Sequence, residues 1–185
     1  MSGRSTKPGH DELAARARVV KLLVFDVDGV LTDGGLYYGP TGEAQKRFDV
    51  KDGHGLVMAR LVGLPAAVLT ARKSGMVEAR GKELGMVAVE QGHKDKKKGL
   101  EEMLARLSLT PDVCAYMGDD TNDLAPMGIV GLPACPSDAA PEVRQRALFV
   151  AQRAGGHGAA RELVELCLKA SGRWQRAIDL MLGAV

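Results

Sequence analysis

Short apolar runs alternate with amphipathic stretches from residue 19 to residue 170. Apolar runs bounded by Gly, Pro or charged residues predict buried strands, and apolar residues spaced three or four apart predict helices. In 94–109, for example, Leu100, Met103, Leu104 and Leu107 share one helix face. The predicted strands are 19–25, 65–70, 86–90, 112–118, 129–135 and 148–151, and the predicted helices are 55–63, 73–85, 94–109, 121–128, 138–147 and 158–170.

This alternation predicts an α/β fold, a Rossmann-like three-layer sandwich with a mainly parallel sheet covered by helices on both faces. One segment departs from the alternation: "LYYGPTGEAQKRF", residues 36–48, has two strand-like runs around a "GPTG" turn. It predicts a projecting β-hairpin. No insertion is long enough for a cap domain. We expect a flexible segment over 1–18, a single domain over 19–170, and a helix or loose tail over 171–185.

Composition excludes several classes of protein. The net charge of +2 and the 4% of aromatic residues give no reason to expect nucleic acid or a charged membrane surface as partner. No apolar run resembles a secretion signal or a membrane span. The three cysteines, Cys114, Cys135 and Cys167, fit no zinc spacing, which favours buried thiols in a reducing compartment. The expected location is the cytoplasm.

Polar side chains gather where the predicted strands end. In parallel sheets, ligands bind beyond the carboxyl ends of the strands, so groups at these ends are expected to meet in space. Each of these motifs alone is more often a turn, a strand-end hydroxyl or a solvated helix face. Together they favour a functional site, and its members are Asp26 and Asp28 after the first strand, Thr70 at the end of the second, at most one of the lysines of 94–98 after the third, and Asp119, Asp120 and Asp123 after the fourth.

These residue types suit phosphoryl transfer through a covalent aspartyl phosphate. Asp26 would be the nucleophile. Asp28, which points the same way in extended backbone, would give a proton to the departing alkoxide and then activate water. Mg²⁺ prefers oxygen ligands, which Asp26 and Asp119 would supply. Thr70 could hydrogen-bond a phosphoryl oxygen, and a lysine could neutralise another.

The motifs "DVDGVLTDG", "LTAR", "DK" and "GDDTND" resemble the four motifs of the haloacid dehalogenase superfamily of phosphatases. The resemblance implies Asp26 as nucleophile and Asp28 as acid and base, with the Asp28 backbone carbonyl also on Mg²⁺. It places Asp119 on the metal, and Thr70 and Lys96 on the phosphate. Asp120 and Asp123 would lie behind them, with Asp123 helping to anchor Lys96.

More narrowly, "DGGLYYGPTGEAQKRFDVKDGHG", "RKSGMVEARGKELGM", "QGHKDK" and "RAGGHGAARE" resemble the family of 3-deoxy-D-manno-octulosonate 8-phosphate phosphatases, which are small and cap-less. This implies a phosphorylated sugar acid as substrate, a role in lipopolysaccharide precursor synthesis, and a homotetramer in which neighbouring hairpins shape each site. We expect substrate contacts from Gly29, Lys51, Asp52, Gly53, Ala71 and Arg72.

Several details stay open from the residues alone. The Arg72 guanidinium suits a carboxylate but fits a structural salt bridge equally well. Ala71 stands where related enzymes often have glycine, and His54 and His157 occupy variable positions whose roles are open. A phosphatase of a nine-carbon, sialic-type ulosonic acid 9-phosphate is the alternative enzyme.

Two further readings are less favoured. A phospho-receiver domain would need its phosphorylated aspartate at the end of the third strand, where "VEQGH" has none. A catalytically inactive binding protein is less favoured because the nucleophile, acid, lysine and metal carboxylate are all present.

Overall fold

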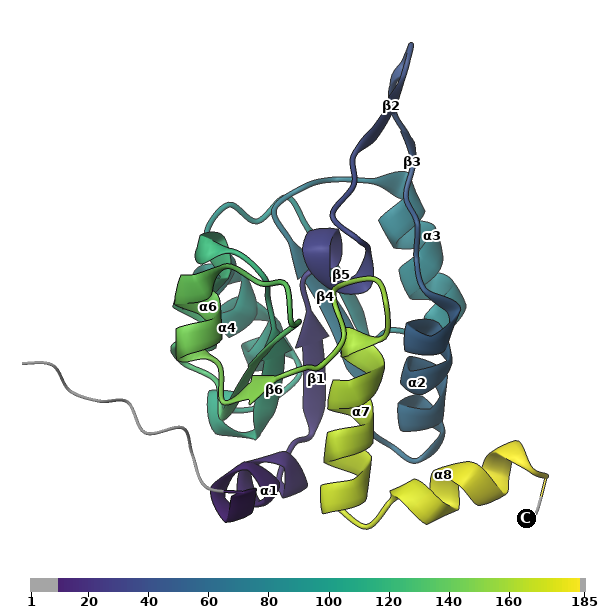
Figure 1. Cartoon of the computed structure of the whole chain (residues 1–185), viewed down its shortest axis with the longest axis vertical. Helices are drawn as coiled ribbons and strands as arrows, with labels where there is room; N and C mark the ends of the chain where they lie inside the picture. Colours follow the sequence, from purple (N-terminus) through teal and green to yellow (C-terminus); the bar gives the residue numbers. More distant parts are fainter. Residues whose placement is uncertain (1–9, 184–185) are drawn as a thin grey trace, which may run out of the picture.

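A six-stranded parallel sheet forms the centre of the computed structural model, which describes residues 10–183 (Figure 1). The strand order is β5-β4-β1-β6-β7-β8, and every neighbouring pair is parallel. The predicted sheet is therefore confirmed. Its strands are β1 (Leu22–Phe25), β4 (Ala66–Thr70), β5 (Ala88–Gln91), β6 (Cys114–Met117), β7 (Leu132–Cys135) and β8 (Phe149–Val150).

Two apolar clusters lie on the two faces of this sheet. Within β1, Leu23 and Phe25 join one cluster, and Leu22 and Val24 join the other, as the alternation of side chains along a strand requires. Both clusters are closed by helices, so the predicted three-layer sandwich is confirmed. The first face is covered by α2 (Val50–Leu61), α3 (Gly75–Leu84) and α7 (Ala159–Ala170), and the second by α4 (Lys96–Arg106), α5 (Leu124–Met127) and α6 (Pro141–Arg146).

A β-hairpin extends from the carboxyl end of the sheet (Figure 1), as predicted for 36–48. Its strands, β2 (Tyr37–Gly39) and β3 (Gly42–Gln45), are antiparallel, and a bridge between Thr32 and Phe48 closes its base. Within residues 10–183 the hairpin is the only insertion between the sheet elements, and no cap domain is present. The carboxyl ends of the strands are therefore accessible from the side of the hairpin.

Helix α2 begins at Val50, five residues before the predicted start at 55. The Asp49 carboxylate caps it by accepting hydrogen bonds from the backbone N–H of Lys51 (2.7 Å) and of Asp52 (3.4 Å). The first turns contain two glycines, which lower helix propensity and hid the helix from the sequence pattern. A Cβ at Gly53 would lie 2.1 Å from a terminal nitrogen of Arg80, so that flexible side chain would have to move to admit it.

The ends of the chain add two helices. Helix α1 (His10–Arg18) was not predicted; it lies in the segment expected to be flexible, although its Ala17 is fully buried against the core. Residues 1–9 lie outside the described part of the chain. Helix α8 (Trp174–Met181) agrees with the helical alternative for 171–185, of which 184–185 are not described. Among the helices of residues 10–183, none combines the length and apolar character that crossing a membrane requires.

Candidate active site

Asp26 stands directly after β1, and its backbone is hydrogen-bonded to the neighbouring strand β6. Its N–H donates to the Met117 carbonyl of β6 at 3.0 Å, and the residue is only 5% exposed. Lys96, the first residue of α4, reaches the same point and is 2% exposed. The Lys96 Nζ lies 2.7 Å from Asp26 Oδ2 and 2.7 Å from Asp123 Oδ1. The predicted nucleophile and the predicted phosphate-binding lysine are therefore a buried ion pair.

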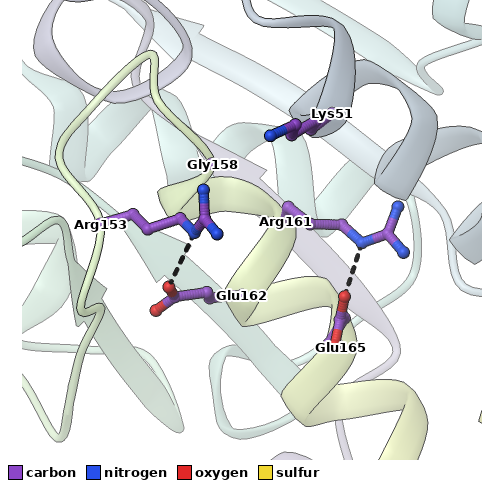
Figure 2. A pocket seen from close by; sticks show the side chains of 6 residues that line it. All are labelled: Lys51, Arg153, Gly158, Arg161, Glu162 and Glu165. Carbon is purple, nitrogen blue, oxygen red and sulfur yellow. Dashed lines mark hydrogen bonds and ion pairs between the residues drawn. The ribbon is translucent and has the colours of Figure 1, made fainter.

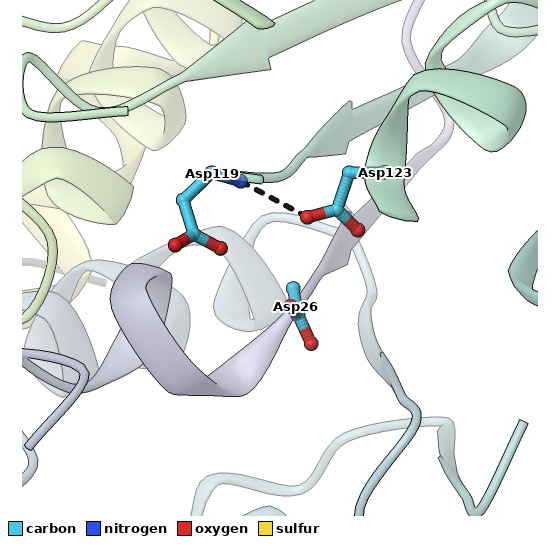
Figure 3. A group of neighbouring side chains, drawn as sticks. All are labelled: Asp26, Asp119 and Asp123. Atoms are coloured by element: carbon cyan, nitrogen blue, oxygen red, sulfur yellow. Dashed lines mark hydrogen bonds between the residues drawn. The ribbon is translucent and has the colours of Figure 1, made fainter. Parts of the chain in front are cut away.

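Three carboxylates face this point: Asp26, Asp119 and Asp123 (Figure 3). One oxygen from each lies within 4.8 Å of the others. Burial raises the pKa of Asp26 to about 6, with the Asp123 charge adding to the rise and Lys96 opposing it. Burial, together with the charges of Asp26 and Asp123, raises the pKa of Asp119 to about 7. The cluster therefore has more negative charge than Lys96 alone neutralises.

The oxygens without protein partners show where a cation fits. Within the described residues, Asp26 Oδ1 is buried and has no hydrogen-bond partner. Asp119 faces the same cavity, whereas both oxygens of Asp123 are already engaged by protein donors. Hard divalent cations such as Mg²⁺ take carboxylate oxygens. The donor set therefore fits Mg²⁺ on Asp26 and Asp119, with Asp123 serving as an anchor behind them.

The anchoring role of Asp123 rests on four contacts. Its Oδ1 accepts from Lys96 Nζ and, at 2.6 Å, from the Tyr116 hydroxyl. Its Oδ2 accepts from the backbone N–H groups of Asp119 (3.0 Å) and Asp120 (3.4 Å). Tyr116 was not identified from the sequence. The available signal was a tyrosine inside a buried strand, because a buried phenol normally needs a hydrogen-bond partner.

The loop after Asp26, Val27–Leu31, is pressed between two other segments. Gly29 has φ +83°, and a Cβ there would lie 2.0 Å from Asp119 Oδ2. On the other side, a Cβ at Gly155 would lie 1.8 Å from the Gly29 carbonyl oxygen, and the Gly156 N–H donates to the Val30 carbonyl at 2.9 Å. Only glycine allows these approaches. The "AGGHG" segment thus supports the loop that follows the nucleophile.

Asp28 belongs to this loop, and two cations contact its carboxylate. Its Oδ1 forms an ion pair with Lys46, and its Oδ2 lies 3.6 Å from Arg72 Nε. Lys46, at the base of the hairpin, also lies 3.0 Å from Glu43 Oε1. Lys46 and Glu43 were not identified from the sequence, where both look like solvent-facing charges of an exposed hairpin.

A cavity of about 250 Å³ joins these groups. Thr70, at the end of β4, is 3% exposed, and its Oγ1 accepts from the Arg72 N–H at 3.4 Å. Nine predicted site residues converge in this cavity from separate parts of the chain. The lining residues are Asp26, Asp28, Gly29, Thr70, Ala71, Arg72, Lys96, Asp119 and Asp120, together with Gly34 and Asn122, which were not predicted.

Three predicted substrate contacts lie elsewhere in this chain. Lys51 lines a separate cavity beside α7, with Arg153 and Arg161 (Figure 2). Asp52 is buried and accepts from the backbone N–H of Arg161 (2.7 Å) and of Gly158 (3.1 Å), and burial raises its pKa.

Gly53 is the third predicted substrate contact that lies outside the Asp26 cavity, and it packs against Arg80. The reason is that α2 packs on α7, so the first turn of α2 meets the start of α7 rather than the Asp26 cavity. His54 and His157 are both exposed and line neither of these cavities.

Known proteins are similar to this chain in sequence and fold. Residues 69–163 match the family described as haloacid dehalogenase-like hydrolase. The chain is 39% identical over 170 residues to the 3-deoxy-D-manno-octulosonate 8-phosphate phosphatase KdsC of Escherichia coli K12. The aligned region covers 92% of this chain and 90% of that protein.

Two solved structures are similar along nearly the whole chain. A probable YrbI family phosphatase from Pseudomonas syringae superimposes with a TM-score of 0.90 and 42% identity, covering 93% of this chain and 98% of that one. The 3-deoxy-D-manno-octulosonate 8-phosphate phosphatase of Moraxella catarrhalis, solved with magnesium, phosphate and KDO, gives a TM-score of 0.90 at 35% identity, covering 94% and 99%. With Asp26, Thr70, Lys96 and Asp119 gathered at one end of the sheet, this chain belongs to the haloacid dehalogenase-like hydrolases and is a phosphatase of their small, cap-less kind.

Proposed function

We propose that this chain hydrolyses 3-deoxy-D-manno-octulosonate 8-phosphate to the free sugar acid and inorganic phosphate, with Mg²⁺ as cofactor. The observation that carries the proposal is the buried Asp26 carboxylate. One of its oxygens is held by Lys96 at 2.7 Å, and the other has no partner among the described residues. The substrate is suggested by the similarity to the phosphatases of Escherichia coli and Moraxella catarrhalis.

The reaction would proceed in two steps on this chain's own residues. An Asp26 oxygen attacks phosphorus, an aspartyl phosphate forms, and the bond from phosphorus to the sugar oxygen breaks. Asp28, which enters this step in its protonated form, gives its proton to that departing oxygen and is left as a carboxylate. Asp28 then takes a proton from water as the water attacks the aspartyl phosphate, which releases inorganic phosphate and restores the Asp26 carboxylate.

Charge neutralisation allows the two anions to meet. Lys96 and the Thr70 hydroxyl lie in the cavity with Asp26, where they would hold the phosphoryl oxygens. When bound, Mg²⁺ would be held by Asp26 and Asp119 and would supply further positive charge between carboxylate and phosphate. Arg72, at the exposed rim of the cavity, is the candidate for the substrate carboxylate, because a guanidinium forms two parallel hydrogen bonds to such a group.

A direct assay can test this proposal. Phosphate release would be measured from eight-carbon and nine-carbon ulosonate phosphates and from simple sugar phosphates, each with Mg²⁺ and with chelator. We expect the highest kcat/KM for the eight-carbon substrate and no turnover in chelator. Preference for a nine-carbon 9-phosphate would instead support the alternative substrate. Membership in a hydrolase family argues against the phospho-receiver alternative.

We also propose a homotetramer whose neighbouring hairpins complete each site. The hairpin and the start of α2 expose apolar side chains, with Leu36 at 46%, Tyr37 at 43% and Val50 at 76% exposed. An isolated two-stranded hairpin is only marginally stable in water, so these side chains favour a second copy as their cover.

A hairpin deletion would not test assembly cleanly, because Lys46 and Glu43 belong to the hairpin and Lys46 contacts Asp28 of the same chain. The better variant is Leu36→Ser with Tyr37→Ser, examined by light scattering and by turnover. We expect loss of the tetramer and of most activity. Leu61→Ser, at a similarly exposed site (44%) at the end of α2, is the matched control. A fully active, stable monomer of the unaltered protein would contradict the idea.

Residues 19–170 are the proposed phosphatase domain, on which α1 and α8 pack. The similarity to enzymes named for 3-deoxy-D-manno-octulosonate 8-phosphate supports a place in lipopolysaccharide precursor synthesis, with the cytoplasm as the proposed location. The three cysteines are all buried free thiols, which is consistent with a reducing compartment. Complementation of a bacterium lacking this phosphatase activity, together with cell fractionation, would test both points.

A further inference from the structure

We propose that Lys46, at the base of the hairpin, is a positioning residue that holds the carboxylate of Asp28 for proton transfer. The inference rests on the proposed function, because it takes Asp28 as the group that protonates the leaving oxygen and later activates water. It adds a residue from the hairpin to a site whose other parts lie at the ends of the sheet strands.

The burial of Lys46 is unusual for its position. The hairpin is exposed on Leu36, Tyr37 and Tyr38, yet the Lys46 side chain is only 1% exposed. Its ammonium group pairs with Asp28 Oδ1 and lies 3.0 Å from Glu43 Oε1. Burying an ammonium group is costly unless it is paired, so the two carboxylates account for its place. Lys46 therefore has a defined position rather than a solvated one.

Asp28 is held from two directions. Lys46 contacts Oδ1, and Arg72 Nε lies 3.6 Å from Oδ2. Arg72 itself is fastened to the hairpin, because its Nη2 donates to the Tyr38 hydroxyl at 3.1 Å and lies 3.8 Å from Glu43 Oε1. Of the two cations, Lys46 is the buried one, while the Arg72 side chain is 42% exposed. Lys46 is therefore the firmer anchor.

The position of Asp28 matters because proton transfer requires hydrogen-bond distance to the leaving oxygen. Asp28 follows Asp26 by two residues in a loop whose Gly29 has φ +83°, and its own side chain is 19% exposed. Without Lys46, the carboxylate would lose its buried contact and could turn toward solvent. The chemistry of Asp26 would be left intact, while proton delivery would be impaired.

This difference gives a readout that a merely structural lysine would not produce. A p-nitrophenolate leaving group departs without protonation, whereas a sugar alkoxide needs a proton. The rate at which the leaving group is released in the first turnover would be measured for two substrates, p-nitrophenyl phosphate and the sugar phosphate that the wild-type enzyme cleaves fastest. The variants are Lys46→Met, Lys46→Arg and the matched surface variant Lys98→Met. Lys98 lies on α4, and its side chain is 71% exposed.

For Lys46→Met we expect sugar phosphate cleavage to slow by roughly 10- to 100-fold, less than the roughly 100- to 10,000-fold that general acid catalysis contributes in full, because Asp28 itself is still present. We expect p-nitrophenolate release to change by less than about 3-fold. Lys46→Arg should restore part of the rate, and Lys98→Met should match wild type. In an Asp28→Asn background, Lys46→Met should add no further loss. Equal loss on both substrates, or an undiminished effect in the Asp28→Asn background, would overturn the role.

If Lys46→Met does not fold, as judged by circular dichroism, Glu43→Gln carries the test, because it removes the second carboxylate that holds Lys46. The rate of sugar phosphate cleavage should then fall a few-fold while p-nitrophenolate release stays unchanged. A loss of this size is expected when one charge-assisted contact is weakened. An unselective loss, or none, would count against the proposal. Failure of the proposed substrate is distinguishable, since the comparison uses whichever sugar phosphate the wild-type enzyme cleaves.

Discussion

Mg²⁺ binding to this enzyme is expected to release protons, and so to weaken steeply as the pH falls. Burial raises the pKa of Asp26 to about 6 and that of Asp119 to about 7 in the metal-free protein. Both groups are proposed ligands, and a carboxylate must lose its proton to bind the ion. Protons and Mg²⁺ therefore compete for the same oxygens.

The size of the effect follows from these two values. At pH 5, competition weakens binding about tenfold through Asp26 and about a hundredfold through Asp119, which together is about 1,000-fold, or about 4 kcal/mol. At pH 8 the competition nearly disappears. Binding should release about 1.4 protons per ion at pH 6 and about 0.1 at pH 8.

Titration calorimetry in buffers of different ionisation enthalpy would count the protons. Asp119→Asn should reduce both the affinity and the proton count, whereas Glu101→Gln, which alters an exposed ion pair on α4, should change neither. A release of less than about half a proton at pH 6, or a dissociation constant that is flat between pH 5 and pH 8, would refute this account of the carboxylate cluster.

The same pKa values set the sign of a stability effect. Because the folded state holds these two protons more tightly than the unfolded chain, their contribution favours folding below pH 4. It is lost as the pH rises through 6 and 7. Metal-free protein should accordingly lose stability over this window, and Mg²⁺ should restore it.

Three substitutions test other parts of the site. Asp26→Asn should abolish phosphate release with an unchanged circular dichroism spectrum, because an amide is not an anionic nucleophile; appreciable steady turnover would contradict the mechanism. Tyr116→Phe removes the 2.6 Å hydrogen bond to Asp123 and should cost about 1–3 kcal/mol in urea unfolding; no loss would mean that Asp123 does not need that donor. Gly155→Ala should cost at least about 1–3 kcal/mol and lower kcat, since its Cβ would lie 1.8 Å from the Gly29 carbonyl oxygen. Gly75→Ala, where the space is open, is the control for that variant, and equal effects of the two would argue against a tight contact.

Most of the fold was predictable because buried apolar residues recur at a different spacing in strands than in helices, so their pattern distinguishes the two. The strand at β1 and the helix at α4 both show unbroken apolar patterns, and both are where the sequence predicted them. Where packing overrides the pattern, prediction failed. The first turns of helix α2 contain two glycines, which lower helix propensity, so this part of the helix looked like a loop. Helix α1 is short and mostly polar, with Ala17 buried in the core and Leu13 packed against it.

The convergence of the site was predictable for a topological reason. Asp26, Thr70, Lys96 and Asp119 follow four parallel strands, and the carboxyl ends of such strands meet at one edge. Lys46 comes from the hairpin, where no topological rule places a side chain. Lys51 shows the reverse error: it is near the hairpin in sequence, but the packing of α2 on α7 turns it toward another cavity.

The contact between Gly29 and its two neighbours constrains how this site can evolve. Asp119 touches the loop on one side and Gly155 on the other, although the three positions are spread over 127 residues of the sequence. A side chain at either glycine would collide with a residue far away in the sequence. A substitution there should therefore be tolerated only together with a compensating substitution at the residue it contacts. In a library that varies one position at a time, these sites would look immutable; a library that varies them jointly would show which alternative loops the sheet edge can accommodate.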